Sequence, residues 1–258
     1  MCVLGAGVMG ARHAEVLAGF PDVDLVGVLD AHCPPESAIA AALALGARSV
    51  VIATPASTHA GLIEAGLGRD LHLLVEKPLA TSREDATALQ AMVDGADVIT
   101  AVGHVERFST LLPMGEWLSG DPIVTQRGGP RPMRIQDVGV LLDLAVHDVD
   151  LVRTVTKRDY ETSSVDVLST DARGVDVEAR ISGRLDDGTT VTHHVSWQAT
   201  SPVRSLRLGS QSHDIRPSSW QPALTAQDRA FVDACVGGRR TALATIADGA
   251  AAVAVVCS

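Results

Sequence analysis

The stretch Val3-Leu-Gly-Ala-Gly-Val-Met-Gly10, followed by Ala-Arg-His-Ala-Glu-Val-Leu-Ala-Gly19, decides the fold. It predicts a short buried strand, a G-x-G-x-x-G turn and a helix, in the order that a dinucleotide-binding unit requires. Gly5 permits the tight turn, Gly7 lets a pyrophosphate approach the backbone, and Gly10 allows the helix to pack closely on the strand. The amides at the start of the helix offer positive potential to the phosphates. The residues predicted to bind the dinucleotide here are Gly5, Ala6, Gly7, Val8, Met9 and Gly10.

A second apolar strand, residues 24–30, ends in Asp30, twenty residues after Gly10. A carboxylate at this place bonds the ribose hydroxyls of NAD and repels the 2′-phosphate of NADP, so NAD is the expected cofactor and NADP the alternative. The next strand, residues 49–54, follows with room for only one helix, near residues 36–45. A mononucleotide-binding half normally has a helix, a strand and another helix in this interval. We therefore predict that its third strand is missing.

Polar residues follow the remaining strands in the first half of the chain. Ala53-Thr-Pro55 ends one strand, Glu76-Lys-Pro78 ends the next, and His104 follows the last. Ligands of open α/β sheets bind at the carboxyl ends of the strands, so Lys77 is expected to face the site. His104 is a further candidate for contact with substrate or cofactor. The predicted dinucleotide-binding domain spans residues 1–102.

A different stretch organises the second half: Val138-Gly-Val-Leu-Leu-Asp-Leu-Ala-Val-His-Asp-Val-Asp150, within a predicted helix at residues 139–156. Asp143 and His147 stand four residues apart, so their side chains share one face. Most of the remaining helix surface is apolar, so the helix is expected to be buried, and a buried charge needs a partner. The two residues are either a core histidine satisfied by a carboxylate or a catalytic pair, and the helix alone does not decide between them.

Three strands follow this helix, at residues 164–169, 175–185 and 189–198. In the second of them apolar and polar residues alternate, as in an antiparallel sheet with one face against a helix. The expected fold is α/β, with an N-terminal Rossmann dinucleotide-binding domain that is shortened after its second strand. A C-terminal α+β domain with a mostly antiparallel open sheet spans residues 103–258. A short helix at residues 111–118 is expected before its first strand, and two helices close the chain.

The composition excludes several classes of protein. The net charge of −10 and the few aromatic residues (three Trp, one Tyr and three Phe) argue against a nucleic-acid binder. No apolar run reaches the roughly 18 residues of a membrane span, and Met1 leads directly into the first strand without an export signal. The four cysteines show no C-x-x-C spacing, so no metal site and no disulfide framework are expected. We expect a cytoplasmic protein that binds neither nucleic acid, nor membrane, nor metal.

One basic segment stands out on this acidic chain. Arg127-Gly-Gly-Pro-Arg-Pro-Met-Arg134 holds three arginines and no acid. Arginine binds phosphate oxygens strongly, so the segment is a candidate anion-binding loop, with a solvated turn as the alternative. The candidate substrate-binding residues in it are Arg127, Arg131 and Arg134.

Together these motifs resemble the Gfo/Idh/MocA family of NAD(P)-dependent sugar oxidoreductases. The resemblance rests on Gly5–Gly10, Ala53-Thr-Pro55 with His59, Glu76-Lys-Pro78, and Asp143-x-x-x-His147-Asp148. Within the family, three segments look most like the UDP-N-acetylglucosamine 3-dehydrogenase-type branch: Gly103-His-Val-Glu-Arg-Phe108, the arginine segment and Asp137-Val-Gly-Val-Leu-Leu-Asp-Leu-Ala-Val-His-Asp148.

The resemblance implies a reaction and a set of roles. Lys77 would lie beside the nicotinamide and bond the reacting sugar oxygen, His147 would be the general acid/base, and Asp143 would hold substrate or orient the histidine. Further cofactor contacts would come from Ala53, Thr54, Pro55, His59, Glu76 and Lys77. The expected reaction is hydride transfer between NAD(P) and a secondary hydroxyl or ketone of a sugar, at C3 of a UDP-linked amino sugar.

Two alternatives stay open. The same chemistry would serve a free polyol, an inositol or a 3-keto sugar. The clipped first strand and the shortened interval after Asp30 would also suit a non-catalytic NAD(P)-binding regulatory protein. In either case the resemblance implies a homodimer or homotetramer formed through the sheet of the second domain.

Overall fold

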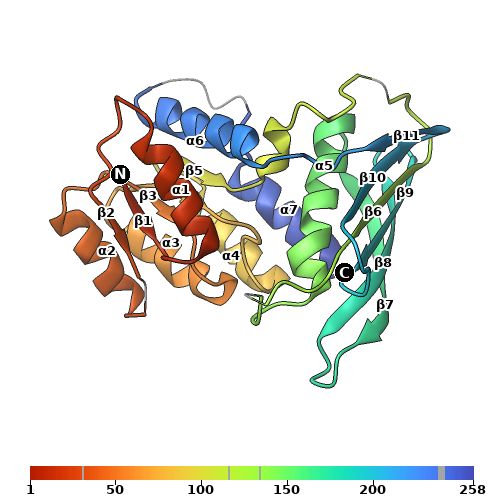
Figure 1. The fold of residues 1–258 in the computed structure, drawn as a ribbon, viewed down its shortest axis with the longest axis horizontal. Helices are drawn as coiled ribbons and strands as arrows, with labels where there is room; N and C mark the ends of the chain where they lie inside the picture. The colour runs from red at the N-terminus through yellow and green to blue at the C-terminus, as the bar shows by residue number, and fades with distance from the viewer. Residues whose placement is uncertain (31, 116, 134, 238–241) are drawn as a thin grey trace. The chain divides into compact units, whose positions relative to one another are not determined.

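The computed structural model describes residues 1–258 except residues 31, 116, 134 and 238–241. The chain forms two compact units, the first containing Met1–Phe108 and Ser219–Ala250, the second Ser109–Ser218 and Ala251–Ser258 (Figure 1). The predicted boundary at residue 102 lies close to the end of the first segment. The sequence predicts residues 219–250 in the second domain, whereas the structure packs them with the first, because their apolar side chains join its core.

The first unit is built on a parallel sheet of five strands in the order β2-β1-β3-β4-β5. The strands are mostly apolar and comprise Cys2–Leu4 (β1), Gly27–Leu29 (β2), Ser49–Ile52 (β3), His72–Val75 (β4) and Thr100–Val102 (β5). In a complete doubly wound sheet a further strand would lie beyond β2. The described residues place no strand there, so the prediction of a missing third strand is confirmed.

Helices cover both faces of this sheet (Figure 1). The connections β1–β2 and β3–β4–β5 run in opposite directions across the sheet, and right-handed crossovers therefore place their helices on opposite faces. On one face α1 (Val8–Ala18) packs against α6 (Gln221–Cys235). On the other face lie α2 (Pro35–Ala44), α3 (His59–Leu67) and α4 (Arg83–Val93). The strand order reverses between β1 and β3, and ligands of such sheets bind at the carboxyl ends of the strands at this point.

Short helical turns extend the carboxyl edge of the sheet. The 3₁₀ turn η1 (Ala56–Thr58) follows β3, and the 3₁₀ turn η2 (Val105–Phe108) follows β5. The start of α4 is capped by Ser82, whose hydroxyl accepts a hydrogen bond from the amide of Asp85 at 3.0 Å.

The second unit is built on a mixed sheet of six strands in the order β11-β10-β6-β9-β8-β7. The strands are Ile123–Gly128 (β6), Tyr160–Thr170 (β7), Asp176–Leu185 (β8), Thr190–Ser196 (β9), Val203–Leu208 (β10) and Gln211–Asp214 (β11). Neighbouring strands are antiparallel except for β6 and β9, which are parallel. The predicted, mostly antiparallel open sheet is therefore confirmed. In β8, Ala179 and Ile181 are buried in the core, whereas Arg180 and Ser182 are exposed, as the alternation predicts.

A helix covers the inner face of this sheet, but it is not a uniform α-helix. Leu141–Ala145 form a π-helical turn (η3), and α5 continues as Val146–Thr156. Both parts contribute buried side chains to the core that lies against β8 and β9. Single π turns inside helices are rare and frequent at functional sites. The last helix, α7 (Ile246–Val256), begins in the first unit and ends in the second.

The predicted helix at residues 111–118 is wrong. The described residues of this segment form turns and irregular structure. Pro113 has no amide hydrogen to donate, and Gly115 has a φ of +82°, which an α-helix does not accommodate. The spacing of the apolar residues in this segment favours a helix, but Pro113 and Gly115 disfavour a helical backbone.

Candidate functional site

The glycine turn has the backbone geometry that a pyrophosphate requires. Gly5 has a φ of +103°, which glycine adopts far more readily than other residues. A Cβ on Gly10 would lie 1.8 Å from the carbonyl oxygen of Gly5, so only glycine lets α1 come this close. A Cβ on Gly7 would meet no atom within 4 Å, which leaves the space beside the turn open to a ligand. No side chain caps the start of α1, so its first amides are available to an anion.

Asp30 directly follows β2, at the same edge of the sheet as the glycine turn. Its side chain is 60% exposed, and its carboxylate lies 3.3 Å from Nε2 of His32. Exposed pairs of this kind contribute only about 0–1 kcal/mol, so the carboxylate can exchange this partner for a ribose hydroxyl at little cost. The residues of the turn and Asp30 therefore fit a dinucleotide.

The segment after β3 is held by His59 rather than left free for a ligand. Nδ1 of His59 lies 2.9 Å from the carbonyl oxygen of Pro78, and Nε2 lies 3.1 Å from that of Thr54. Burial lowers the pKa of His59, and a neutral ring can donate to only one of these two carbonyls. Thr54 also exchanges a hydrogen bond with Thr58, at 2.7 Å. His59 thus ties the end of β3 to the lysine-containing turn after β4.

Lys77 lies in that turn, directly after β4. The amide of Glu76 donates to the carbonyl oxygen of Ile52 in β3 at 2.9 Å, which extends the sheet pairing to the residue before the lysine. The Glu76 side chain is buried, and a Cβ on Gly103 would lie 2.8 Å from Oε1 of Glu76. Gly103 therefore makes room for the carboxylate. His104, the next residue, is 2% exposed, so its ring is shielded from solvent.

A buried ion cluster includes Glu76, the residue before Lys77, and was not predicted from the sequence. Nδ1 of His13 in α1 lies 2.9 Å from both carboxylate oxygens of Asp228 in α6, and Nε2 lies 3.1 Å from Oε1 of Glu76. Burial alone would lower the pKa of His13, but hydrogen bonds and charge from Asp228 and Glu76 raise it to about 10. Burial by itself would raise the pKa of Glu76, but the hydrogen bond from His13 and the nearby charges of His13, Lys77 and His59 together lower it. His13 is therefore a buried imidazolium, which we name, with its two carboxylates, the His13 cluster.

In the second unit, Asp143 lies in the π turn and His147 at the beginning of α5. Asp143 is 3% exposed and accepts a hydrogen bond from Nε1 of Trp197 at 3.3 Å, while His147 is half-buried. The amide of Leu141 donates to Asp176 at 2.8 Å, which caps the start of the π turn from the neighbouring strand β8. Trp197 was not singled out from the sequence, because its bond to Asp143 spans 54 residues.

Arg127 does not lie in the arginine loop as expected. It belongs to β6 and is 3% exposed. Its Nε donates to Oδ1 of Asp148 at 2.7 Å, and Nη2 lies 2.5 Å from the same oxygen. Asp148, on the sheet-facing side of α5, also accepts a bond from Thr125 at 3.1 Å. The charge of Arg127 is thus balanced inside the unit, because a buried guanidinium needs a partner.

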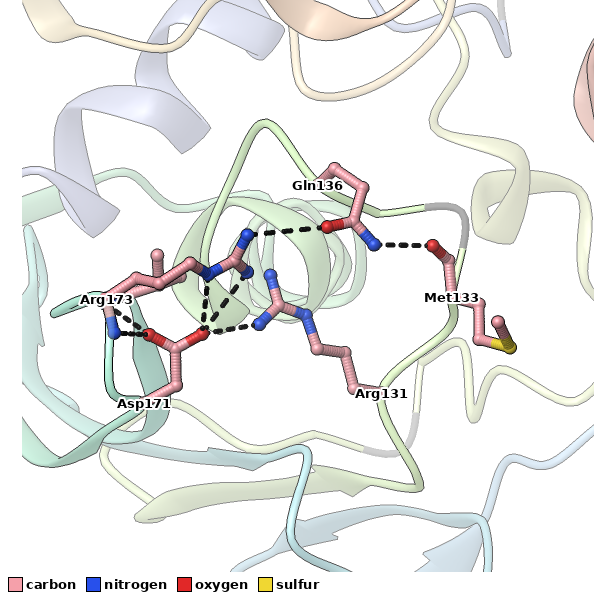
Figure 2. A network of polar contacts seen from close by, with 6 residues as sticks. Arg131, Met133, Gln136, Asp171 and Arg173 are labelled. Carbon is pink, nitrogen blue, oxygen red and sulfur yellow. Dashed lines mark hydrogen bonds and ion pairs between the residues drawn. The ribbon is translucent and has the colours of Figure 1, made fainter.

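The side chain of Arg131, in the arginine segment, takes part in a polar network (Figure 2). Its Nη1 donates to Asp171 at 2.8 Å, and its Cζ lies 4.6 Å from the centre of the Trp197 ring. Arg173 binds the same carboxylate, at 3.3 Å, and reaches Gln136 at 3.5 Å. Nε and Nη2 of Arg131, the edge that binds anions with two parallel bonds, make no hydrogen bond within the described residues. Arg134 lies outside the described residues.

A second buried histidine lies in the sheet of the second unit. Nδ1 of His193 lies 2.7 Å from the hydroxyl of Thr125, and Nε2 lies 2.6 Å from that of Tyr160. Burial, together with the charge of Arg127, lowers the pKa of His193 to about 3. Its neighbour His194 points to the other face of β9 and pairs with Glu178 at 2.9 Å. Both histidines therefore have partners within the sheet.

The described residues show no group of three or more His, Cys, Asp or Glu side chains arranged to hold a metal ion. Nor do they include a helix that is long and apolar enough to cross a bilayer.

Two models of one family match the chain. The model of an oxidoreductase family with an NAD-binding Rossmann fold matches residues 45–104, and the model of the GFO/IDH/MocA C-terminal domain matches residues 115–210. The chain belongs to the GFO/IDH/MocA family of oxidoreductases. Its first unit is the NAD-binding unit, and the resemblance inferred from the four motifs is confirmed. The match begins at residue 45, after the shortened interval, so the glycine turn is established by its own geometry.

Two curated relatives and one solved structure show the range of this family. The chain is 29% identical to a UDP-N-acetylglucosamine 3-dehydrogenase from Acidithiobacillus ferrooxidans, over 80% of this chain and 69% of the relative. It is 25% identical to a scyllo-inositol 2-dehydrogenase (NAD(+)) from Bacillus subtilis, over 83% of this chain and 69% of the relative. The structure of GenD2 from gentamicin A biosynthesis, in complex with NAD, shares the fold with a TM-score of 0.80 at 23% identity, covering 99% of this chain and 91% of that one.

Proposed function

We propose that this oxidoreductase transfers hydride between NAD and a secondary hydroxyl or ketone of a sugar, at C3 of a UDP-linked amino sugar. The observation that best supports the reaction is the position of Lys77. It is the second residue after β4, at the carboxyl edge that also carries the glycine turn. A cofactor held by that turn extends along this edge, where ligands of open α/β sheets bind.

Each proposed catalytic residue has a defined task. NAD supplies the hydride acceptor or donor when it is bound. The Lys77 ammonium bonds the reacting oxygen and stabilises alkoxide character as it develops. His147 takes the hydroxyl proton, for which an imidazole is suited near neutral pH. Asp143, held by Trp197, orients the histidine or binds the sugar.

The nucleotide part of the substrate is supported by two observations. The relative at 29% identity is named for a UDP-linked amino sugar. Nε and Nη2 of Arg131 are buried and have no hydrogen-bond partner among the described residues, while Asp171 and Trp197 contact the rest of its guanidinium. This edge of a guanidinium can donate two parallel hydrogen bonds to the oxygens of a phosphate. Since Asp148 balances the charge of Arg127, Arg131 is the principal diphosphate contact that we propose in this segment.

A free polyol or inositol is the second candidate substrate. It is supported by the inositol dehydrogenases among the relatives, at 25–30% identity. A neutral polyol has no phosphate for Arg131 to bind. The effect of an Arg131 substitution on KM therefore distinguishes the two candidate substrates. The homodimer or homotetramer expected from the family remains a prediction.

A substrate panel tests the proposal. Wild-type protein is assayed by NADH absorbance with UDP-N-acetylglucosamine, free N-acetylglucosamine, myo-inositol and scyllo-inositol, each with NAD and NADP. We expect turnover of the UDP-linked sugar with NAD, and a fall of about 10²–10⁴-fold in kcat for Lys77→Ala and for His147→Ala. Arg131→Met should raise KM for the nucleotide sugar and leave NADH binding unchanged, with Arg180→Met on the exposed face of β8 as the matched control.

Three results would contradict the proposal in different ways. Preference for inositol, with Arg131→Met unchanged, would replace the substrate. Full activity of Lys77→Ala and His147→Ala would remove the catalytic assignments. NADH binding without turnover of any sugar, and no effect of His147→Ala on any property, would favour a non-catalytic NAD-binding protein.

A further inference from the structure

The His13 cluster carries one more negative than positive charge. His13 is an imidazolium because both ring nitrogens face carboxylates, and Glu76 and Asp228 are its two counter-ions; burial raises the pKa of Asp228, and the hydrogen bond and charge of His13 oppose that shift. The side chains of His13 and Asp228 are completely buried, and that of Glu76 is 9% exposed. Lys77, next to Glu76 in the chain, supplies a second positive charge, and this charge acts on the Glu76 carboxylate. The four groups together are electrically balanced.

The cluster also joins three elements that are far apart in sequence. His13 lies on α1, in the turn that follows Gly10, Glu76 immediately precedes Lys77, and Asp228 lies on α6. Glu76 is fixed at both ends, by its amide on Ile52 and by its carboxylate on His13. A side chain fixed in this way leaves little freedom to the backbone of the next residue. Burying charged groups is costly, because each buried ion loses its hydration, so a buried cluster of three charged groups suggests a functional role.

We propose that His13 and Asp228 are positioning residues for Lys77. The imidazolium of His13 binds Glu76, and Asp228 binds the imidazolium. Because His13 lies on α1, directly after the glycine turn, these contacts fix the position of Lys77 relative to that turn. The proposal builds on the proposed function only in its kinetic consequence, because the position of Lys77 can be observed without any substrate.

The lysine content of the chain makes a direct test possible. The chain contains only two lysines, Lys77 and Lys157, and Lys157 lies exposed at the end of α5 in the second unit. Protein labelled with ¹³C at the lysine side chains therefore gives two sets of NMR signals, which Lys77→Arg assigns. We expect His13→Gln to shift or broaden the Lys77 signal and to leave that of Lys157 unchanged. His193→Gln, the same substitution at a completely buried histidine of the second unit, should leave both signals unchanged.

The kinetic test is a double-mutant cycle. His13→Gln should lower kcat about 10- to 100-fold, the cost of misplacing a catalytic group by about 1 Å. In the Lys77→Ala background the same change should lower kcat less than twofold, because the residue that it positions is absent. Asp228→Asn keeps the shape of the cluster and serves if His13→Gln does not fold. It should give the same two results with a smaller fall in kcat.

The outcomes are distinct. An unmoved Lys77 signal in folded His13→Gln and Asp228→Asn would overturn the positioning role. So would an equal loss of kcat in both backgrounds, because that result describes a structural role alone. Full kcat of Lys77→Ala would instead remove the kinetic consequence together with the proposed role of Lys77. In that case the NMR result would still decide whether the cluster fixes the lysine.

Discussion

His13 in the first unit and His193 in the second are both completely buried, yet they have opposite charge states. His13 faces carboxylates with both ring nitrogens, and its pKa is raised to about 10. His193 faces two hydroxyl groups, and burial with the nearby charge of Arg127 lowers its pKa to about 3. Burial by itself favours the neutral form in both places. The partners, rather than the depth of burial, therefore decide the charge.

The two surroundings also differ in what they connect. The partners of His193 are hydroxyl groups on two other strands of the same sheet, Thr125 on β6 and Tyr160 on β7. The partners of His13 come from a helix of the C-terminal segment and from the turn that carries Lys77. A neutral network suits the interior of a sheet, since it needs no charge balance. An ionic network costs more to bury. It is also far more sensitive to the loss of one member, because the remaining charge is then left without a partner.

The largest expected effect is on stability. His13→Gln leaves two buried carboxylates without their cation, and we expect it to destabilise the first unit by about 3–5 kcal/mol. Urea unfolding at pH 7, followed by circular dichroism, measures the change. His32→Gln, at an exposed histidine paired with Asp30, is the matched control and should change stability by less than about 0.5 kcal/mol. Equal effects of the two substitutions would show that His13 is not charged.

The second effect is a dependence of stability on pH. The pKa of His13 is about 10 when folded and about 6.5 when unfolded, so between these values the folded state binds one more proton. The stabilisation is fully present below pH 6.5 and decreases as the pH rises toward 10, by at most about 1.4 kcal/mol per pH unit. The urea midpoint of the wild type should be lower at pH 9 than at pH 7. For His13→Gln the difference between the two midpoints should be smaller.

His193 should show the reverse dependence. Its pKa is about 3 when folded and about 6.5 when unfolded, so the unfolded state binds the extra proton. Its contribution is present above pH 6.5 and is lost as the pH falls toward 3. His193→Gln should therefore reduce the fall in the free energy of unfolding between pH 6.5 and pH 4. It should leave the pH dependence of stability above pH 7 unchanged. A flattened alkaline side would mean that the two histidines had been assigned the wrong way round.

The smallest effect concerns one hydroxyl. Tyr160→Phe removes the bond to Nε2 of His193 and leaves the ring in the core, so we expect a loss of about 1 kcal/mol in the free energy of unfolding. This loss should not depend on pH between 7 and 9, because burial keeps the pKa of His193 below this range and that of Tyr160 above it. A loss that grew with pH would indicate that His193 shares a proton with the tyrosine.

Local sequence patterns predicted the features that depend on neighbouring residues. The glycine turn, the missing strand after β2 and the alternation in β8 all follow from short-range spacing, and the structure has them. The predicted helix at residues 111–118 fails because Pro113 and Gly115 oppose what the apolar residues favour. The π turn that contains Asp143 was also unforeseen, since its residues have an ordinary helical pattern.

The site depended on partners that no short-range pattern reveals. His13 lies within the stretch that decides the fold, but its partner Asp228 is 215 residues away. Arg127 looked like a loop cation because Asp148, its partner, is 21 residues further along the chain and on another element. In both cases a charged residue was recognised, and its role depended on which opposite charge the fold brought to it.

The missing strand has a consequence for the solubility of the protein. It makes β2 the edge of the parallel sheet, with Val28 41% exposed. An unprotected sheet edge is a template for pairing with other chains, and natural proteins often keep such strands short. β2 has only three residues, so it presents few unpaired backbone groups. The shortened nucleotide-binding half therefore avoids creating an aggregation-prone edge, whereas a redesign that lengthened β2 without restoring its neighbour would create one.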